Sequence, residues 1–130
     1  MDTARATLLA VDDDVATLSL LVDLLEGEGY RVERAHSAAD GLGRLQQGPV
    51  DLVLADLMLP DMNGLEFCER VRASKRLEQV PIIVVSAASG ACWKERCATA
   101  GANGYISKPF DIDNLLALVD GELAPITAPR

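Results

Sequence analysis

An almost unbroken apolar run reads Pro-Ile-Ile-Val-Val-Ser-Ala at residues 81–87. Its length and its β-branched side chains predict a strand, and the scarcity of polar residues predicts burial on both faces. Similar runs occupy residues 7–11 and 50–55, and weaker ones occupy residues 30–35 and 104–107. Strands buried on both faces are typical of a parallel sheet packed between helices.

Segments with helical periodicity separate these runs. Apolar residues recur at helical spacing in four of the segments, namely Val15, Leu18, Val22 and Leu25; Ala38, Leu42 and Leu45; Leu65, Cys68 and Val71; and Ile112, Leu115, Leu116, Val119 and Leu123. Ser37 is a candidate N-cap, Asn63-Gly64 marks a turn before the third helix, and Gly27, Gly29 and Gly48-Pro49 are stop signals. A fourth helix with a poor apolar face is expected at about residues 89–100.

Five strand–helix repeats with right-handed crossovers predict an α/β fold, with helices on both faces of a twisted five-stranded parallel sheet. We expect one domain over residues 1–124 and a tail or linker over residues 125–130.

The formal net charge of −8 argues against direct nucleic-acid binding, because phosphates would be repelled. The lack of an apolar run of about 20 residues or of a signal peptide predicts a cytoplasmic protein without membrane contact. One histidine beside three cysteines leaves too few ligands for a zinc site.

Open parallel sheets place functional groups outside the carboxyl ends of their strands. Asp12 and Asp13 follow the first strand, and Asp56 follows the third. Such a cluster of carboxylates fits Mg²⁺, which prefers oxygen ligands and offsets their mutual repulsion. Taken alone, Asp12 and Asp13 are explained equally well as helix caps, and Asp14 is expected to be a cap.

Two further polar residues end the remaining strands. Ser86 follows the fourth strand, and Lys108-Pro109 follows the fifth. Beside three acids the lysine would act as a counter-ion, and the hydroxyl could donate to a phosphoryl oxygen. A carboxylate such as Asp56 could then act as the nucleophile toward a phosphoryl donor.

The order and spacing of these residues resemble the receiver domains of bacterial response regulators. Asp56 and Ser86 are 30 residues apart, Ser86 and Lys108 are 22 apart, and the segments 56–64 and 101–110 are similar to family motifs. The resemblance covers about residues 6–124. It implies a flavodoxin-like doubly wound sheet with strand order 2-1-3-4-5 and a role in two-component signalling.

The resemblance also implies residue roles. Asp13 and Asp56 would contact Mg²⁺ directly, Asp12 would do so through water, and the backbone carbonyl of Met58 would complete the protein ligands. Asp56 would accept the phosphoryl group from a histidine kinase or a histidine phosphotransfer protein. The phosphoryl oxygens would be bound by Ser86 and Lys108, the Lys108–Pro109 peptide bond would be cis, and Tyr105 would be the aromatic switch residue.

On this basis the chain is expected to be a switch rather than an enzyme, catalysing only its own phosphorylation and dephosphorylation. Movement of Ser86 and Tyr105 would alter the face formed by the fourth helix, fifth strand and fifth helix, to which Trp93 would belong. That face would control a partner protein or an output domain. The kinase, the target and the oligomeric state, a homodimer included, stay open.

The sequence departs from the family at three positions. Asn63 replaces a commonly acidic loop residue, and Met58 and Ala88 cannot readily position an attacking water. We therefore expect a phosphoryl group that is not especially short-lived. Three alternative functions fit the sequence less well. A haloacid-dehalogenase-like phosphatase would need an acidic residue at position 58, where Met58 stands, and a flavodoxin-like electron carrier would need a phosphate-binding loop in place of Asp12 and Asp13. An inactive pseudo-receiver would lack some of the site residues, whereas this sequence has the complete set.

Overall fold

Apolar strands alternate with helices throughout the computed structural model, which describes residues 6–88 and 91–127. The elements are β1 (Thr7–Val11), α1 (Val15–Gly27), β2 (Arg31–Ala35), α2 (Ala38–Gln47), β3 (Leu52–Ala55), α3 (Gly64–Ala73), a short 3₁₀ helix η1 (Lys75–Leu77), β4 (Ile82–Ser86), α4 (Ala91–Ala100), β5 (Gly104–Ser107) and α5 (Ile112–Thr127). The predicted alternation of strands and helices is confirmed. The expected start of the fourth helix at residues 89 and 90 lies outside the described residues.

The five strands form one parallel sheet in the order β2-β1-β3-β4-β5, as predicted. Val11 is opposite Ala35 in β2 and Ala55 in β3, and Ala55 is opposite Val84 in β4. Because the strands run in the same direction with this register, the residues that follow β1, β3, β4 and β5 meet at one edge of the sheet. The sheet thereby positions the candidate site.

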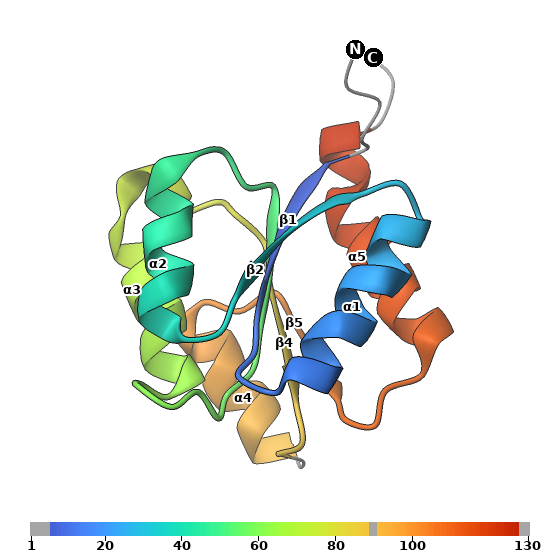
Figure 1. Cartoon of the computed structure of the whole chain (residues 1–130). Helices are drawn as coiled ribbons and strands as arrows, with labels where there is room; N and C mark the ends of the chain where they lie inside the picture. The colour runs from blue at the N-terminus through green and yellow to red at the C-terminus, as the bar shows by residue number, and fades with distance from the viewer. Residues whose placement is uncertain (1–5, 89–90, 128–130) are drawn as a thin grey trace.

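Helices cover both faces of the sheet, and each face has its own apolar core (Figure 1). α1 and α5 lie on one face, while α2, α3 and α4 lie on the other. Successive side chains of a strand point to opposite faces. Accordingly, Leu8 and Ala10 pack on the α1–α5 side, and Leu9 and Val11 pack on the opposite side.

Side-chain caps explain where two helices begin. The Ser37 hydroxyl accepts a hydrogen bond from the Asp40 N–H at 3.1 Å, which confirms the predicted cap of α2. The Asn63 carboxamide oxygen accepts from the Glu66 N–H at 2.9 Å. Helix α3 therefore begins at Gly64, with Asn63 as its cap rather than as a turn before the helix.

The structure corrects several boundaries and burial assignments. β3 begins at Leu52 rather than at residue 50, and the flanking Asp51 carboxylate instead accepts the Thr7 N–H at 2.9 Å. Val15 and Ile112 are 65% and 45% exposed, although the helical pattern placed both on apolar faces. Each is the first residue of its helix.

Smaller differences concern the edges of the sheet and the end of the chain. β2 and β4 are one or two residues shorter than predicted. β5 is only half-buried because it is an edge strand, whereas β1, β3 and β4 are buried almost throughout. α5 continues to Thr127 and so passes residue 124, where the domain boundary was expected. The last residues of the expected tail, 128–130, are outside the described chain.

Candidate functional site

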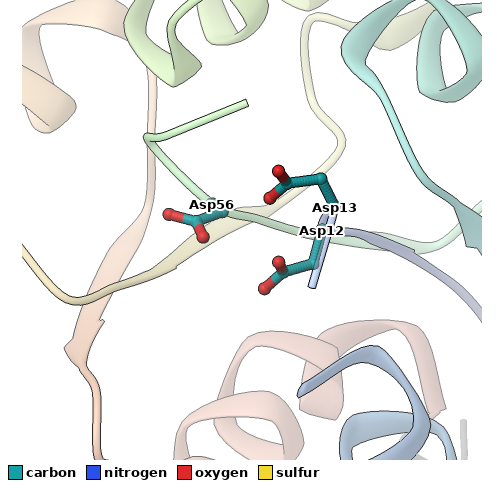
Figure 2. Close-up of side chains that lie close together, drawn as sticks. All are labelled: Asp12, Asp13 and Asp56. Carbon is teal, nitrogen blue, oxygen red and sulfur yellow. The ribbon is translucent and has the colours of Figure 1, made fainter. Parts of the chain in front are cut away.

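Three carboxylates converge at the carboxyl edge of the sheet (Figure 2). Asp12 directly follows β1 and Asp56 directly follows β3; the Asp12 N–H donates to the Ala35 carbonyl and the Asp56 N–H donates to the Val11 carbonyl, both at 3.1 Å. One carboxylate oxygen from each of Asp12, Asp13 and Asp56 lies within 4.8 Å of the others. Asp12 and Asp56 are buried, and Asp13 is exposed. The sheet therefore brings together the three acids that the sequence singled out.

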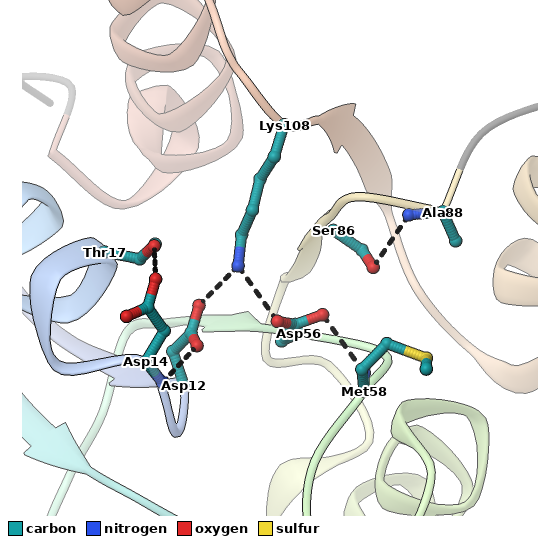
Figure 3. Close-up of polar contacts among 8 residues, drawn as sticks. All are labelled: Asp12, Asp14, Thr17, Asp56, Met58, Ser86, Ala88 and Lys108. Carbon is teal, nitrogen blue, oxygen red and sulfur yellow. Dashed lines mark hydrogen bonds and ion pairs between the residues drawn. The ribbon is translucent and has the colours of Figure 1, made fainter.

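Lys108 bridges the two buried acids from the loop after β5 (Figure 3). Its Nζ lies 2.8 Å from Oδ2 of Asp12 and 2.9 Å from Oδ2 of Asp56. The lysine side chain is 18% exposed, and the two carboxylates are 2% and 9% exposed. The Lys108–Pro109 peptide bond is cis, as the resemblance implied. The predicted counter-ion is thus in place.

Burial and pairing act in opposite directions on the pKa values of Asp12 and Lys108. Burial raises the pKa of Asp12, and the hydrogen bond from Lys108 offsets part of that shift. Burial alone would lower the pKa of Lys108, but hydrogen bonds to Asp12 and Asp56 hold it above its usual value. The ammonium therefore stays protonated and compensates the buried carboxylates.

The second oxygen of each buried acid is held by the backbone. Oδ1 of Asp12 accepts the Asp14 N–H at 2.9 Å, and Oδ1 of Asp56 accepts the Met58 N–H at 3.1 Å. Asp14 occupies the N-cap position of α1, as expected, but its carboxylate accepts the Thr17 hydroxyl at 2.5 Å rather than capping a backbone N–H. That hydrogen bond lowers the pKa of Asp14. These contacts fix the directions of the carboxylates.

Ser86 and Tyr105 are linked through the backbone of Ala88. The Ser86 side chain is fully buried at the end of β4, and its Oγ accepts the Ala88 N–H at 3.3 Å. The Tyr105 hydroxyl donates to the Ala88 carbonyl. Burial raises the pKa of this phenol. The two predicted switch residues therefore contact the same residue of the loop between β4 and α4.

The loop between β3 and α3 contains a residue that sequence reasoning missed. Asp61 accepts backbone hydrogen bonds from Ala38 at 2.9 Å and Ala39 at 2.8 Å, the first residues of α2. These bonds lower the pKa of Asp61. No local pattern signals this contact, because Asp61 and Ala38 are 23 residues apart.

An apolar surface borders the site. The four large hydrophobic side chains that are most exposed in the described chain are Val15, Leu20, Met58 and Ile112. They belong to α1, to the loop after β3 and to the start of α5. A groove of about 490 Å³ lined by Leu20, Pro109, Phe110 and Ile112, among others, reaches Lys108. Two of the four, Leu20 and Ile112, line this groove, and contiguous exposed apolar surface of this kind marks interaction sites.

The remaining candidate residues lie away from the acids. Cys68 and Cys97 are buried and Cys92 is exposed, and within residues 6–88 and 91–127 the acidic trio is the one cluster able to hold a metal. Trp93 lies on α4, half-buried against the core, with the Arg96 guanidinium 4.5 Å from its ring centroid. Across the described residues, no helix has the length and hydropathy needed to cross a membrane.

Comparison with known proteins identifies the family. Residues 8–120 match the family model of the response regulator receiver domain. The histidine-protein kinase BarA of Escherichia coli is 38% identical over 109 residues, which are 84% of this chain and 12% of BarA. The response regulator ArlR of Staphylococcus saprophyticus is 38% identical over 87% of this chain and 50% of ArlR. The chain thus spans half or less of the length of these relatives.

The fold agrees with solved structures of the same kind. The crystal structure of a putative response regulator from Chloroflexus aurantiacus superimposes with a TM-score of 0.88 and 35% identity. The match covers 92% of this chain and 98% of that one. The strand order, the cluster of three carboxylates with Lys108 at the carboxyl edge and these matches lead to one conclusion: the chain belongs to the family of response regulator receiver domains, the phosphoacceptor modules of two-component signalling.

Proposed function

We propose that Asp56 is the phosphoacceptor and that its phosphorylation requires Mg²⁺. The observation that carries this proposal is the convergence of Asp12, Asp13, Asp56 and Lys108 at one edge of the sheet. Asp56 suits the acceptor role because Lys108 and the Met58 N–H hold its carboxylate, and because its side chain, at 9% exposure, is the more accessible of the two buried acids. Phosphoryl transfer needs mainly positioning and charge compensation, and this arrangement provides both.

The donor set fits Mg²⁺. Asp12, Asp13 and Asp56 offer only oxygen ligands, and Mg²⁺ binds through one or two carboxylates while keeping several waters. These acids, with the backbone carbonyl of Met58, would hold the ion. Bound there, Mg²⁺ would compensate negative charge on the phosphoryl group.

The residues of the chain perform the other steps. An Asp56 carboxylate oxygen forms the new bond to phosphorus as the N–P bond of a phosphohistidine breaks, and the histidine nitrogen keeps the bonding electron pair. Lys108, already 2.9 Å from Asp56, pairs with the phosphoryl oxygens. Ser86 donates its hydroxyl to the same group. The chain acts only on itself in this scheme, so it is a switch and not an enzyme with a separate substrate.

Phosphorylation of Asp56 is transmitted to the surface of the domain through Ala88, in the loop between β4 and α4. Movement of the Ser86 hydroxyl toward a phosphoryl group would break the hydrogen bond that it now accepts from the Ala88 N–H. Ala88 also holds the Tyr105 hydroxyl, so the tyrosine responds to the same movement. Because Tyr105 belongs to β5, the α4–β5–α5 face would differ between the two states and would control a partner protein or an output domain.

The phosphodonor is a protein, a histidine kinase or a histidine phosphotransfer protein. A small phosphodonor needs no docking surface, whereas this site is bordered by the apolar side chains of Leu20, Phe110 and Ile112. Kinase and response-regulator relatives support a donor of this class. The apolar border would be covered when the donor presents its phosphohistidine to Asp56.

The test uses acetyl phosphate and intact-mass measurement. Wild-type protein should gain the mass of one phosphoryl group with Mg²⁺ and none after chelation. Asp56→Asn should gain none, and the control Asp23→Asn, which removes an exposed acid of α1, should behave as wild type. Unmodified wild-type protein with Mg²⁺, or equal modification of Asp56→Asn, would overturn the proposal.

A further inference from the structure

The loop that carries Met58 is closed at its base. The Gly64 N–H donates to the Leu57 carbonyl at 2.8 Å, and Met58 pairs with Asn63 in an isolated antiparallel bridge. Gly64 itself packs so closely that a Cβ would lie 2.6 Å from the Asp56 carbonyl oxygen. The base of the loop is therefore fixed against the end of β3.

The tip of the loop is held by a different element. Both carboxylate oxygens of Asp61 bind the first two backbone N–H groups of α2, at 2.9 and 2.8 Å. These N–H groups have no partner within the helix, and the positive end of the helix dipole favours the carboxylate. Ser37 already provides the local cap of α2 through Asp40. The helix thus has two caps, and of these two the Asp61 carboxylate is the one that comes from the loop after β3.

We propose that Asp61 is a positioning residue for the metal site. Fixed at its base and at its tip, the loop can hold the Met58 backbone in one place, with its N–H on Asp56. The Met58 carbonyl, which the proposed function assigns to the ion, would then be held in one place too. Leu59 and Met62 of the same loop also pack against the core. Without the contact to α2 the loop keeps this packing but loses its polar anchor, so the carbonyl samples more positions and ordering it costs binding free energy. This inference rests on the proposed function, since it concerns the same Mg²⁺ site.

The experiment compares two caps of one helix. Mg²⁺ is titrated calorimetrically into wild type, Asp61→Ala, Asp61→Asn and Ser37→Ala without a phosphodonor. Asp61→Ala should raise the dissociation constant by about tenfold, as for other residues that orient metal ligands. Asp61→Asn keeps one acceptor oxygen and should give a smaller increase. Ser37→Ala removes a cap without touching the loop and should bind Mg²⁺ as wild type does.

A kinetic measurement separates positioning from general loosening. With acetyl phosphate, the Asp61→Ala protein should need more Mg²⁺ for half-maximal phosphorylation but should approach the wild-type rate at saturating Mg²⁺. An unchanged dissociation constant in Asp61→Ala, or an equal increase in Ser37→Ala, overturns the inference and leaves Asp56 as the acceptor. A wild-type protein that binds no Mg²⁺ overturns the proposed function and this inference together.

Discussion

Replacement of Lys108 by methionine should destabilise the metal-free protein strongly. Lys108 is the cation shared by Asp12 and Asp56, whose side chains are 2% and 9% exposed. Removal of one partner from a buried ion pair costs about 3–5 kcal/mol, and the 18% exposure of Lys108 favours the lower end of that range, about 3 kcal/mol. For a domain of this size the melting temperature should fall by roughly 10 °C.

Mg²⁺ should restore part of that loss. In Lys108→Met the ion would compensate the carboxylates of Asp12 and Asp56, which have lost their lysine partner, and no lysine ammonium would repel the ion. The stabilisation by Mg²⁺ should therefore be larger in Lys108→Met than in wild type. The measurement is urea unfolding of both proteins with and without Mg²⁺. The control is Lys75→Met, which removes the same charge from an exposed position on η1. A loss no larger than that of the control, or an equal effect of Mg²⁺ on both proteins, would refute the electrostatic account.

Three further predictions concern a glycine, the phosphoryl lifetime and the cysteines. Gly64→Ala should cost about 2 kcal/mol in urea unfolding because its Cβ would meet backbone at 2.6 Å, whereas Gly43→Ala in α2, with nothing within 4 Å, should be neutral or stabilising. Met58→Asn places a polar group beside the acceptor that can position an attacking water, and it should shorten the half-life of the phosphorylated protein; an unchanged half-life would contradict the expectation that Met58 limits hydrolysis in this way. In native protein a thiol reagent should modify Cys92 alone at neutral pH, because Cys92 is exposed while burial raises the pKa of Cys68 to about 12; rapid labelling of a second thiol would show that the core opens.

Much of the site could be predicted from sequence because the fold itself assembles it. Parallel strands end at one edge, so the residues after four apolar runs were expected to meet, and Asp12, Asp56, Ser86 and Lys108 do lie there. The strength of the prediction came from the number of polar residues at strand ends. No single one of them is distinctive.

The features that escaped prediction depend on long-range contacts. Asp61 caps α2 by accepting hydrogen bonds from Ala38 and Ala39, which precede it by 23 and 22 residues, and no periodicity or turn signal in the sequence indicates such bonds. Val15 and Ile112 fit the apolar periodicity of their helices, but as the first residues of those helices they stay exposed. Helical spacing shows which residues share a face, and only the packed structure shows how far along the helix that face is buried.

The central claim, that Asp56 itself carries the phosphoryl group, is tested most directly by reductive trapping. Borohydride reduces an aspartyl phosphate to homoserine, and peptide mass spectrometry then locates the altered residue. Protein treated with acetyl phosphate and Mg²⁺ should contain homoserine at position 56. Homoserine at another position, or none in protein that has gained a phosphoryl group, would contradict the account.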